Sequence, residues 1–182
     1  MPCGPTALTS RRSNGSWAAT RSTSSREACP TTEVRRVAGH IPWRTVDLTL
    51  QASRSIWIAT TRPDGRPHAM PLWFWWDGRD VSFITQRSTQ KARNLAGEPW
   101  VVVHAGDGDD VIILEGRAEI VVDEDELARI DAGYRDKYVD PGSGEQATIF
   151  NEGDDCYRVR VEHVMAWSYG TIGTRTDWRF GR

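Results

Sequence analysis

Hydrophobic residues recur at helical spacing in two parts of the chain. In residues 43–53, which follow a proline, Val46 and Leu50 lie four apart, and this spacing predicts a short amphipathic helix. Residues 123–138 carry large apolar side chains at intervals of three or four, with acidic residues in the first turn and basic residues in the last. That pattern predicts a longer helix whose apolar stripe packs into the core.

Shorter stretches that are rich in β-branched and aromatic residues predict about six strands, at 55–62, 67–76, 80–86, 100–105, 111–122 and 157–167. Turn residues separate most of them, which favours hairpin connections. We therefore expect a mainly β protein built as an antiparallel barrel with peripheral helices. Pro71 lies inside one of these strands, so the barrel is expected to be split or open near it.

The strand predicted over residues 67–76 is unusual because both of its faces are apolar. From Ala69 onward the sequence A-M-P-L-W-F-W-W offers no polar side chain that could face water. Asp77-Gly78 then predicts a tight hairpin turn, with residues 80–86 as the partner strand. Something other than solvent must cover the second face of the strand.

The segment after the partner strand, R-S-T-Q-K-A-R-N-L, has the features of a phosphate site. Ser88 is expected to cap a helix that runs through Leu95 and stops at Gly97. Free amides at the helix start, hydroxyl groups and the charges of Arg87 and Lys91 would then converge on one point. A solvated basic turn on a short helix explains the same residues equally well.

On such a helix Arg87, Lys91 and Asn94 fall near one face, whereas Ala92 and Leu95 point toward the core. The apolar strand and this turn lie close together in the sequence. A planar aromatic ligand that carries a phosphate could place its ring along the strand and its phosphate at the helix. This adjacency favours the ligand-binding interpretation.

The chain has 182 residues and a formal net charge of -2, which suits one domain and gives no electrostatic reason to expect nucleic acid or an anionic membrane as partner. Residues 1–33 are rich in Ser, Thr and Arg, so we expect a disordered leader before a single domain at 34–182. The three cysteines belong to no metal-binding motif. No apolar run is long enough to cross a bilayer, and the cytoplasm is the expected location.

Three stretches, in this order, carry a family resemblance: I-A-T-T-R-P-D-G-R-P-H-A-M-P-L-W-F-W-W-D-G, F-I-T-Q-R-S-T-Q-K-A-R-N-L and E-P-W-V-V-V-H. Over roughly residues 50–167 the chain resembles the flavin and deazaflavin split-barrel superfamily, the pyridoxamine 5'-phosphate oxidase-like proteins. Its S-x-x-K-x-x-N motif, G-D-G-D-D turn and closing T-R-T-D-W-R-F are most similar to actinobacterial oxidoreductases that use the deazaflavin coenzyme F420.

The resemblance implies a six-stranded split β-barrel that forms a homodimer, with two cofactor sites in the interface grooves. It implies that the cofactor ring lies beside Met70, Pro71, Leu72 and Trp73, with Thr85 and Gln86 next to it. The phosphate region would be held by Arg87, Ser88, Lys91 and Asn94. The S-R-K of pyridoxamine oxidases is replaced here by S-T-Q-K at 88–91, which argues against an FMN phosphate clamp and an oxidase assignment. The C-terminal segment with substrate-phosphate ligands that the family's oxidases carry is not recognised in this sequence, which argues against a vitamin B6 substrate.

The main hypothesis is an oxidoreductase in which a hydride passes between coenzyme F420 and a small unsaturated or aromatic substrate, with no side chain assigned as catalytic. An FMN-dependent oxidase or reductase on the same fold is the first alternative. A non-catalytic binder of flavin, deazaflavin or haem is the second, with His68 or His104 as candidate axial ligand. Arg175 and Trp178 resemble groups that close over the cofactor from the partner subunit.

Overall fold

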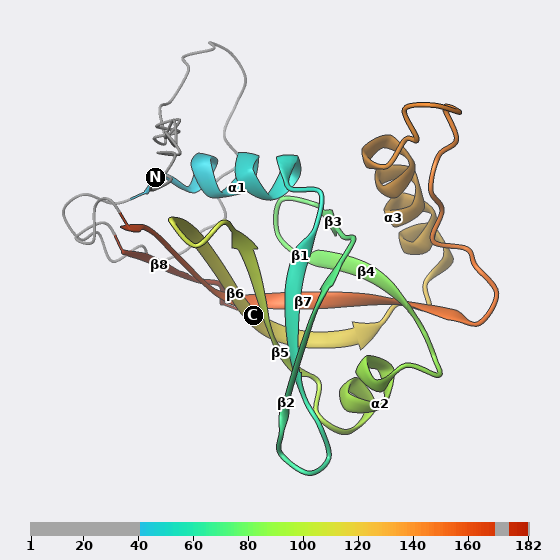
Figure 1. Ribbon diagram of the computed structural model, residues 1–182, viewed down its shortest axis with the longest axis horizontal. Coiled ribbons are helices and arrows are strands. Elements are labelled where there is room, and N and C mark those ends of the chain that lie inside the picture. Colours follow the sequence, from blue (N-terminus) through green and yellow to red (C-terminus); the bar gives the residue numbers. More distant parts are fainter. Residues whose placement is uncertain (1–40, 170–174, 182) are drawn as a thin grey trace, which may run out of the picture.

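The computed structural model describes residues 41–169 and 175–181 and has a curled antiparallel sheet with helices around it (Figure 1). Within these residues eight strands form the sheet, which are β1 (Ile56–Thr61), β2 (Pro67–Leu72), β3 (Trp75–Trp76), β4 (Val81–Gln86), β5 (Trp100–Gly106), β6 (Asp110–Ile120), β7 (Asp154–Ser168) and β8 (Thr176–Arg179). The strand order is β2-β1-β5-β6-β7-β4-β3, and β8 pairs with β7. The predicted mainly β split-barrel class is confirmed. The leader predicted at 1–33 lies outside the described residues.

The helices are α1 (Trp43–Ala52), α2 (Gln90–Gly97) and α3 (Glu124–Lys137). Two of them match the helices predicted from periodicity, because α1 buries Val46 and Leu50 completely and α3 buries Ile130 and Tyr134. No helix in the described part of the chain is long and apolar enough to span a membrane.

The strand predicted over 67–76 is in fact divided, and only its last two residues pair with β4. The first part, β2, pairs with β1 and forms an edge of the sheet, as Pro71 predicted. The division falls where α3 supplies hydrogen bonds in place of a strand. The Tyr134 hydroxyl donates to the carbonyl of Trp73 at 2.7 Å, and the Tyr138 hydroxyl accepts from the amide of Phe74 at 2.8 Å.

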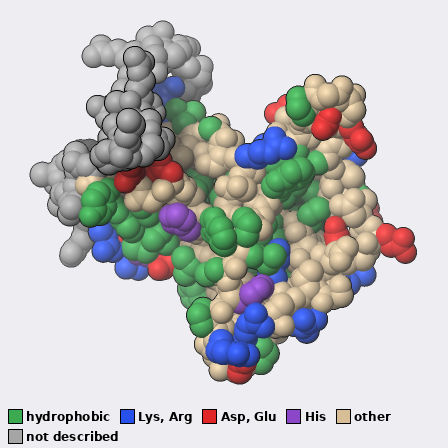
Figure 2. All heavy atoms as spheres, in the orientation of Figure 1, with side chains coloured by type: hydrophobic (Ala, Val, Ile, Leu, Met, Phe, Trp, Pro, Cys, Tyr) green, Lys and Arg blue, Asp and Glu red, His purple; other side chains and the backbone are tan. Residues whose placement is uncertain are grey.

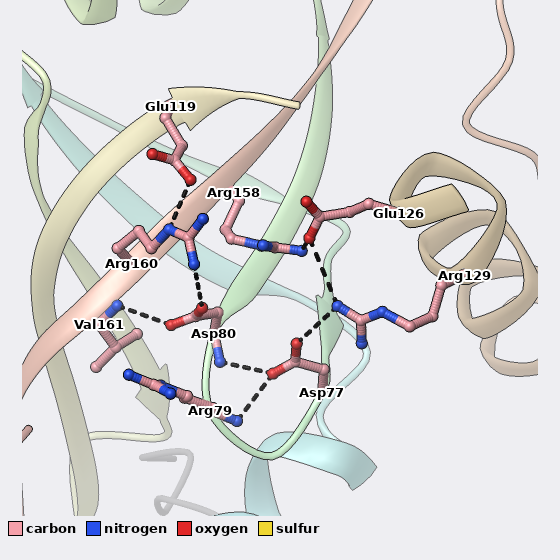
Figure 3. A network of polar contacts seen from close by, with 9 residues as sticks. All are labelled: Asp77, Arg79, Asp80, Glu119, Glu126, Arg129, Arg158, Arg160 and Val161. Carbon is pink, nitrogen blue, oxygen red and sulfur yellow. Dashed lines mark hydrogen bonds and ion pairs between the residues drawn. The ribbon is translucent and has the colours of Figure 1, made fainter. Parts of the chain in front are cut away.

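Helix α3 is held against the β3–β4 hairpin by a close contact and by ion pairs. Gly133 faces the ring of Trp75 so closely that a Cβ atom at this position would lie 2.1 Å from the indole Nε1. Arg129 lies over the same ring and pairs with Asp77 at 3.1 Å and with Glu126 at 3.6 Å (Figure 3). These contacts fix the distance between α3 and the residues at the end of β2.

The core inside the barrel includes Trp178, whose ring packs edge-on against Trp43 with 5.4 Å between centroids. Trp178 is 5% exposed, because β8 folds back onto β7 and places alternate side chains inside. The interpretation of Trp178 as a group that reaches the partner's cofactor therefore does not fit its position within its own subunit.

Candidate functional site

The turn before α2 is built differently from the sequence prediction. The N-cap is Thr89 rather than Ser88, and the Thr89 hydroxyl accepts from the amide of Ala92 at 3.2 Å. A second hydroxyl, that of Thr85, lies 3.0 Å from Thr89 and supports the cap from β4. Ser88 is exposed, and its hydroxyl bonds to no other described residue. It is therefore available to a ligand, beside the start of α2, where the Thr89 cap already uses the amide of Ala92.

Arg87 is the most accessible charge of this turn. Its side chain is 66% exposed and its Nε lies 2.7 Å from a carboxylate oxygen of Asp155. The backbone amide of Arg87 donates to the carbonyl of Gly153 at 3.0 Å, which pins the turn to the start of β7. The Asp155 side chain is only 18% exposed, so the guanidinium is the accessible partner of this pair and the group that a bound anion can reach.

Asn94 lies on the inner face of α2 and is 1% exposed. Its amide nitrogen donates to the Thr60 hydroxyl of β1 at 2.9 Å, and its amide oxygen accepts from Gln90 at 2.7 Å. These bonds tie the helix to the sheet. A buried amide with both ends satisfied orients the turn and does not face a ligand from this position.

Lys91 is also buried, with 4% of its surface exposed. The ammonium lies 5.3 Å from the centroid of the Phe83 ring. Burial lowers the pKa of Lys91, and the nearby carboxylate of Asp154 opposes that shift. The Oδ1 atom of Asp154 is itself buried and has no hydrogen-bond partner among the described residues. The inward direction of Lys91 and Asn94 differs from the expectation that only Ala92 and Leu95 face the core.

The residues expected beside the cofactor ring take two orientations on the edge strand. Met70 and Leu72 are half-buried and pack against the barrel core, whereas Pro71 is exposed next to Trp57. Thr85 is buried and Gln86 is exposed at the end of β4. Of the set, Trp73 presents the largest accessible aromatic surface, with 47% of the residue exposed.

Two adjoining cavities of about 330 and 310 Å³ flank Trp73, and both are also lined by Glu145, Gln146 and Ala147. We call them together the Trp73 groove. The surface is hollowed between the sheet and the lobe that carries α3 (Figure 2). No pattern in residues 139–153 predicts a cavity, because the cavity arises only where this segment faces Trp73.

One side of the groove is an aromatic platform. The rings of Trp73 and Tyr138 are stacked with 4.7 Å between centroids and 5° between planes, and the Arg54 guanidinium lies 5.2 Å from the Trp73 centroid. Burial raises the pKa of Tyr138 to about 12 and raises that of Tyr134 as well. Both hydroxyls therefore stay protonated at neutral pH, and they serve the backbone of residues 73 and 74 rather than proton transfer.

The groove and the turn before α2 are joined along β4 and the start of β7. Ile84 lines the groove two residues before Gln86, at the end of the same strand. Asn151 also lines it, and its amide donates to the Asp154 carboxylate at 3.3 Å. Arg87 and the groove therefore lie at two ends of one surface.

A second accessible surface is the outer face of the sheet. Trp57, Trp100 and Val102 are 52%, 41% and 39% exposed, and hydrophobic side chains gather on this face over β1, β2 and β5 (Figure 2). His104 shares the face because it pairs with Trp57. His68 pairs with Thr60, the third residue along from Trp57, and so lies on the opposite face. The two histidines cannot both reach one ligand on the outer face.

The curled antiparallel sheet, open at the β2 edge, defines this chain as a split-barrel protein. A sequence profile described as pyridoxamine 5'-phosphate oxidase matches residues 44–167, and the chain belongs to that family.

Solved structures share the fold at low sequence identity. Rv2991, a conserved hypothetical protein from Mycobacterium tuberculosis, is 24% identical over 76% of this chain and 92% of its own, with a TM-score of 0.62. A haem-binding protein from Mycobacterium smegmatis is 20% identical over 72% and 55%, with a TM-score of 0.58. HutZ, the haem storage protein from Vibrio cholerae, is 16% identical over 65% and 89%, with a TM-score of 0.54. A comparison with curated proteins finds no match.

Proposed function

We propose that this protein is an oxidoreductase that binds the deazaflavin coenzyme F420 and exchanges a hydride between it and a small planar unsaturated or aromatic substrate. The observation that carries the proposal is the placement of an anion-compatible turn and an aromatic groove at two ends of one surface. When bound, the cofactor supplies the hydride chemistry. F420 is preferred to FMN because the S-T-Q-K sequence at 88–91 lacks the arginine of the oxidase motif.

The residues present fit a phosphate at the turn in part. The Arg87 guanidinium and the Ser88 hydroxyl are accessible donors, and donors of these kinds bind phosphate. Lys91 and Asn94 lie beneath them, so their proposed contribution is to orient the helix start from inside. The cofactor ring is proposed to lie beside Met70, Pro71, Leu72, Trp73, Thr85 and Gln86.

The substrate is proposed to bind in the Trp73 groove. Trp73, which is 47% exposed and backed by the buried ring of Tyr138, offers an aromatic surface, and the segment at 145–148 lines the opposite side. A planar ring would gain both burial and ring contact there. Because the tyrosine hydroxyls of this platform are committed to backbone groups, the chain is proposed to orient and desolvate its ligands without a side-chain acid or base.

The outer face of the sheet is proposed to be covered by a second copy of the chain. Half-exposed Trp57 and Trp100 on one sheet face are typical of residues buried on association. Replacing Trp57 with Glu should convert a dimer into a monomer in light scattering after size exclusion. Leu48→Glu is the matched control, because Leu48 is similarly exposed, at 51%, but lies on helix α1 and not on a strand of this face. A monomeric unaltered protein, or a W57E dimer of unchanged stability, would refute the proposal.

The cofactor proposal is tested by fluorescence titration of the purified protein with F420 and, separately, with FMN. Arg87→Ala should weaken F420 binding by about tenfold or more, since a hydrogen bond to a charged group contributes roughly 1.5–3 kcal/mol. Arg160→Ala is the control, because Arg160 is similarly exposed and pairs with Glu119 on the β6 side. Micromolar FMN binding without a response to F420 would contradict the cofactor assignment, and equal affinities of both variants would contradict the phosphate position.

A further inference from the structure

One part of the wall of the Trp73 groove is held by a buried carboxylate. Asp131 on α3 is 7% exposed, and its Oδ1 accepts from the Thr148 hydroxyl at 2.6 Å and from the amide of Ile149 at 2.9 Å. Its Oδ2 accepts from Nε of Arg135 at 2.5 Å. The two carboxylate oxygens therefore have different tasks, because one holds the loop and the other holds a neighbour on the same helix.

The rest of this loop is fastened at its start, close to the end of α3. The amide of Ala147 donates to the carbonyl of Tyr138 at 2.9 Å, and Val139 forms a bridge with Gln146. Beyond Ala147, the side chain of Ile149 is 4% exposed and packs in the core cluster that contains Tyr134. Between these points Asp131 accepts the hydrogen bonds that set the distance between the wall and Trp73.

We propose that Asp131 is a positioning residue that holds the 145–149 wall at the separation from Trp73 that suits a compact planar substrate. This inference rests on the proposed function, in which the substrate occupies the groove. A wall that is already ordered before binding loses little conformational entropy when the ligand binds. The affinity for the ligand is higher for that reason. Loosening the wall should weaken binding of the planar ligand without changing the turn that is proposed to bind the cofactor.

The size of the groove narrows the substrate class. Its two cavities of about 330 and 310 Å³ each lie at the lower end of the range for small-molecule sites, roughly 300–1,000 Å³. One or two fused rings in contact with the exposed part of Trp73 match this space better than an extended polycycle. Glu145 lines both cavities and Arg54 lines one, so an uncharged ring avoids an unfavourable contact with either.

The two carboxylate oxygens of Asp131 have different partners, so different variants remove different contacts. Asp131→Ala removes both bonds to the wall. Asp131→Asn can keep both if its amide oxygen takes the Oδ1 position, while it loses the ion pair with Arg135. Arg135→Ala removes only that ion pair, and Thr148→Val removes one wall bond and leaves Asp131 in place.

The experiment uses protein labelled with 5-fluorotryptophan and titrated with the naphthoquinone menadione in the absence of cofactor. The ¹⁹F signal of Trp73 is assigned as the one missing from Trp73→Phe. Menadione should shift this signal, and Asp131→Ala should raise the dissociation constant about tenfold or more, because both hydrogen bonds that hold the wall are lost. Thr148→Val should lie between, and Asp131→Asn and Arg135→Ala should stay within about threefold of the unaltered protein.

Hydrogen exchange provides a second readout, since the Ile149 amide should exchange faster in Asp131→Ala than in Arg135→Ala. Unchanged menadione affinity in Asp131→Ala, or equal losses in Asp131→Ala and Arg135→Ala, would overturn the role of Asp131. Menadione binding that leaves the Trp73 signal unmoved would overturn the groove as its site. Neither result would alter F420 binding at the turn, so failure here is distinguishable from failure of the cofactor proposal.

Discussion

Gly133 is the position at which the docking of α3 can be tested most sharply. A Cβ atom there would lie 2.1 Å from Nε1 and 2.2 Å from Cε2 of Trp75, whereas ordinary contacts are 3.4–4 Å. Gly133→Ala must therefore push the helix and the indole apart by roughly 1 Å. Overpacking typically costs about 1–3 kcal/mol, and the cost here falls in the upper part of that range, about 2–3 kcal/mol, because two ring atoms would lie within 2.2 Å. Alanine recovers up to about 1 kcal/mol through its better helix propensity. The net destabilisation should be about 1–2 kcal/mol.

The assay is thermal and urea unfolding followed by circular dichroism. For a chain of this size, each kcal/mol corresponds to about 2–4 °C in Tm, so a fall of roughly 2–8 °C is expected. Gly97→Ala is the matched control, because Gly97 ends α2 and nothing lies within 4 Å of the added methyl group. That variant should be as stable as the unaltered protein or slightly more so. A Gly133→Ala protein as stable as Gly97→Ala would refute the close packing of α3 on Trp75.

Two further predictions concern titratable groups. Burial alone would raise the pKa of Asp131, but hydrogen bonds from Thr148, Arg135 and the Ile149 amide outweigh burial and lower the pKa. The ionised carboxylate therefore stabilises the fold above about pH 4, and this stabilisation is lost as the pH falls below that value. Urea unfolding at pH 7 and pH 3 should accordingly show a smaller acid-induced loss in Asp131→Asn, and an equal loss would contradict the hydrogen-bonding role. Burial raises the pKa of Cys156 to about 12. In a protein with Cys3 and Cys29 replaced by serine, a disulfide reagent at pH 8 should therefore react with Cys156 only after unfolding. Rapid reaction of the folded protein would contradict the burial of this thiol.

Much of the fold could be predicted because its signals are local. The spacing of Val46 and Leu50 defines the buried face of α1, and Asp77-Gly78 marks a turn in which Gly78 has a φ of 94°, a conformation that suits glycine. The apolar sequence of residues 67–76, by contrast, is compatible with one long strand. Its division depends on two tyrosine hydroxyls more than 60 residues away, and no local pattern announces them.

The candidate site also has one part that could be predicted from the sequence and another that could not. The turn at 87–91 was visible because Ser, Thr, Arg and Lys cluster before a helical segment, and Arg87 and Ser88 are accessible there. Lys91 and Asn94 are harder to place from sequence, since the rotation of a short helix is set by what it packs against. Here Phe83 and Thr60 decide it. The Trp73 groove depends on the distance between α3 and the end of β2 and could not be derived from any single segment.

The contacts that dock α3 stabilise the fold and also shape the groove in which the substrate is proposed to bind. Contacts that dock α3, such as Gly133 against Trp75, also hold Tyr138 against Trp73. A variant that shifts α3 should therefore lose substrate affinity before it loses the cofactor turn, which is attached to β4 and β7. This separation would let the two ends of the proposed site be assayed independently.

The central claim, that the chain binds a deazaflavin at the turn before α2, is tested most directly by the absorption spectrum of the protein after incubation with F420 and FMN together and removal of unbound ligand. The proposal predicts the deazaflavin band in the unaltered protein and its loss in Arg87→Ala. A flavin spectrum with no deazaflavin band would contradict it in favour of FMN, and a Soret band that appears only on addition of haem would identify a haem binder instead.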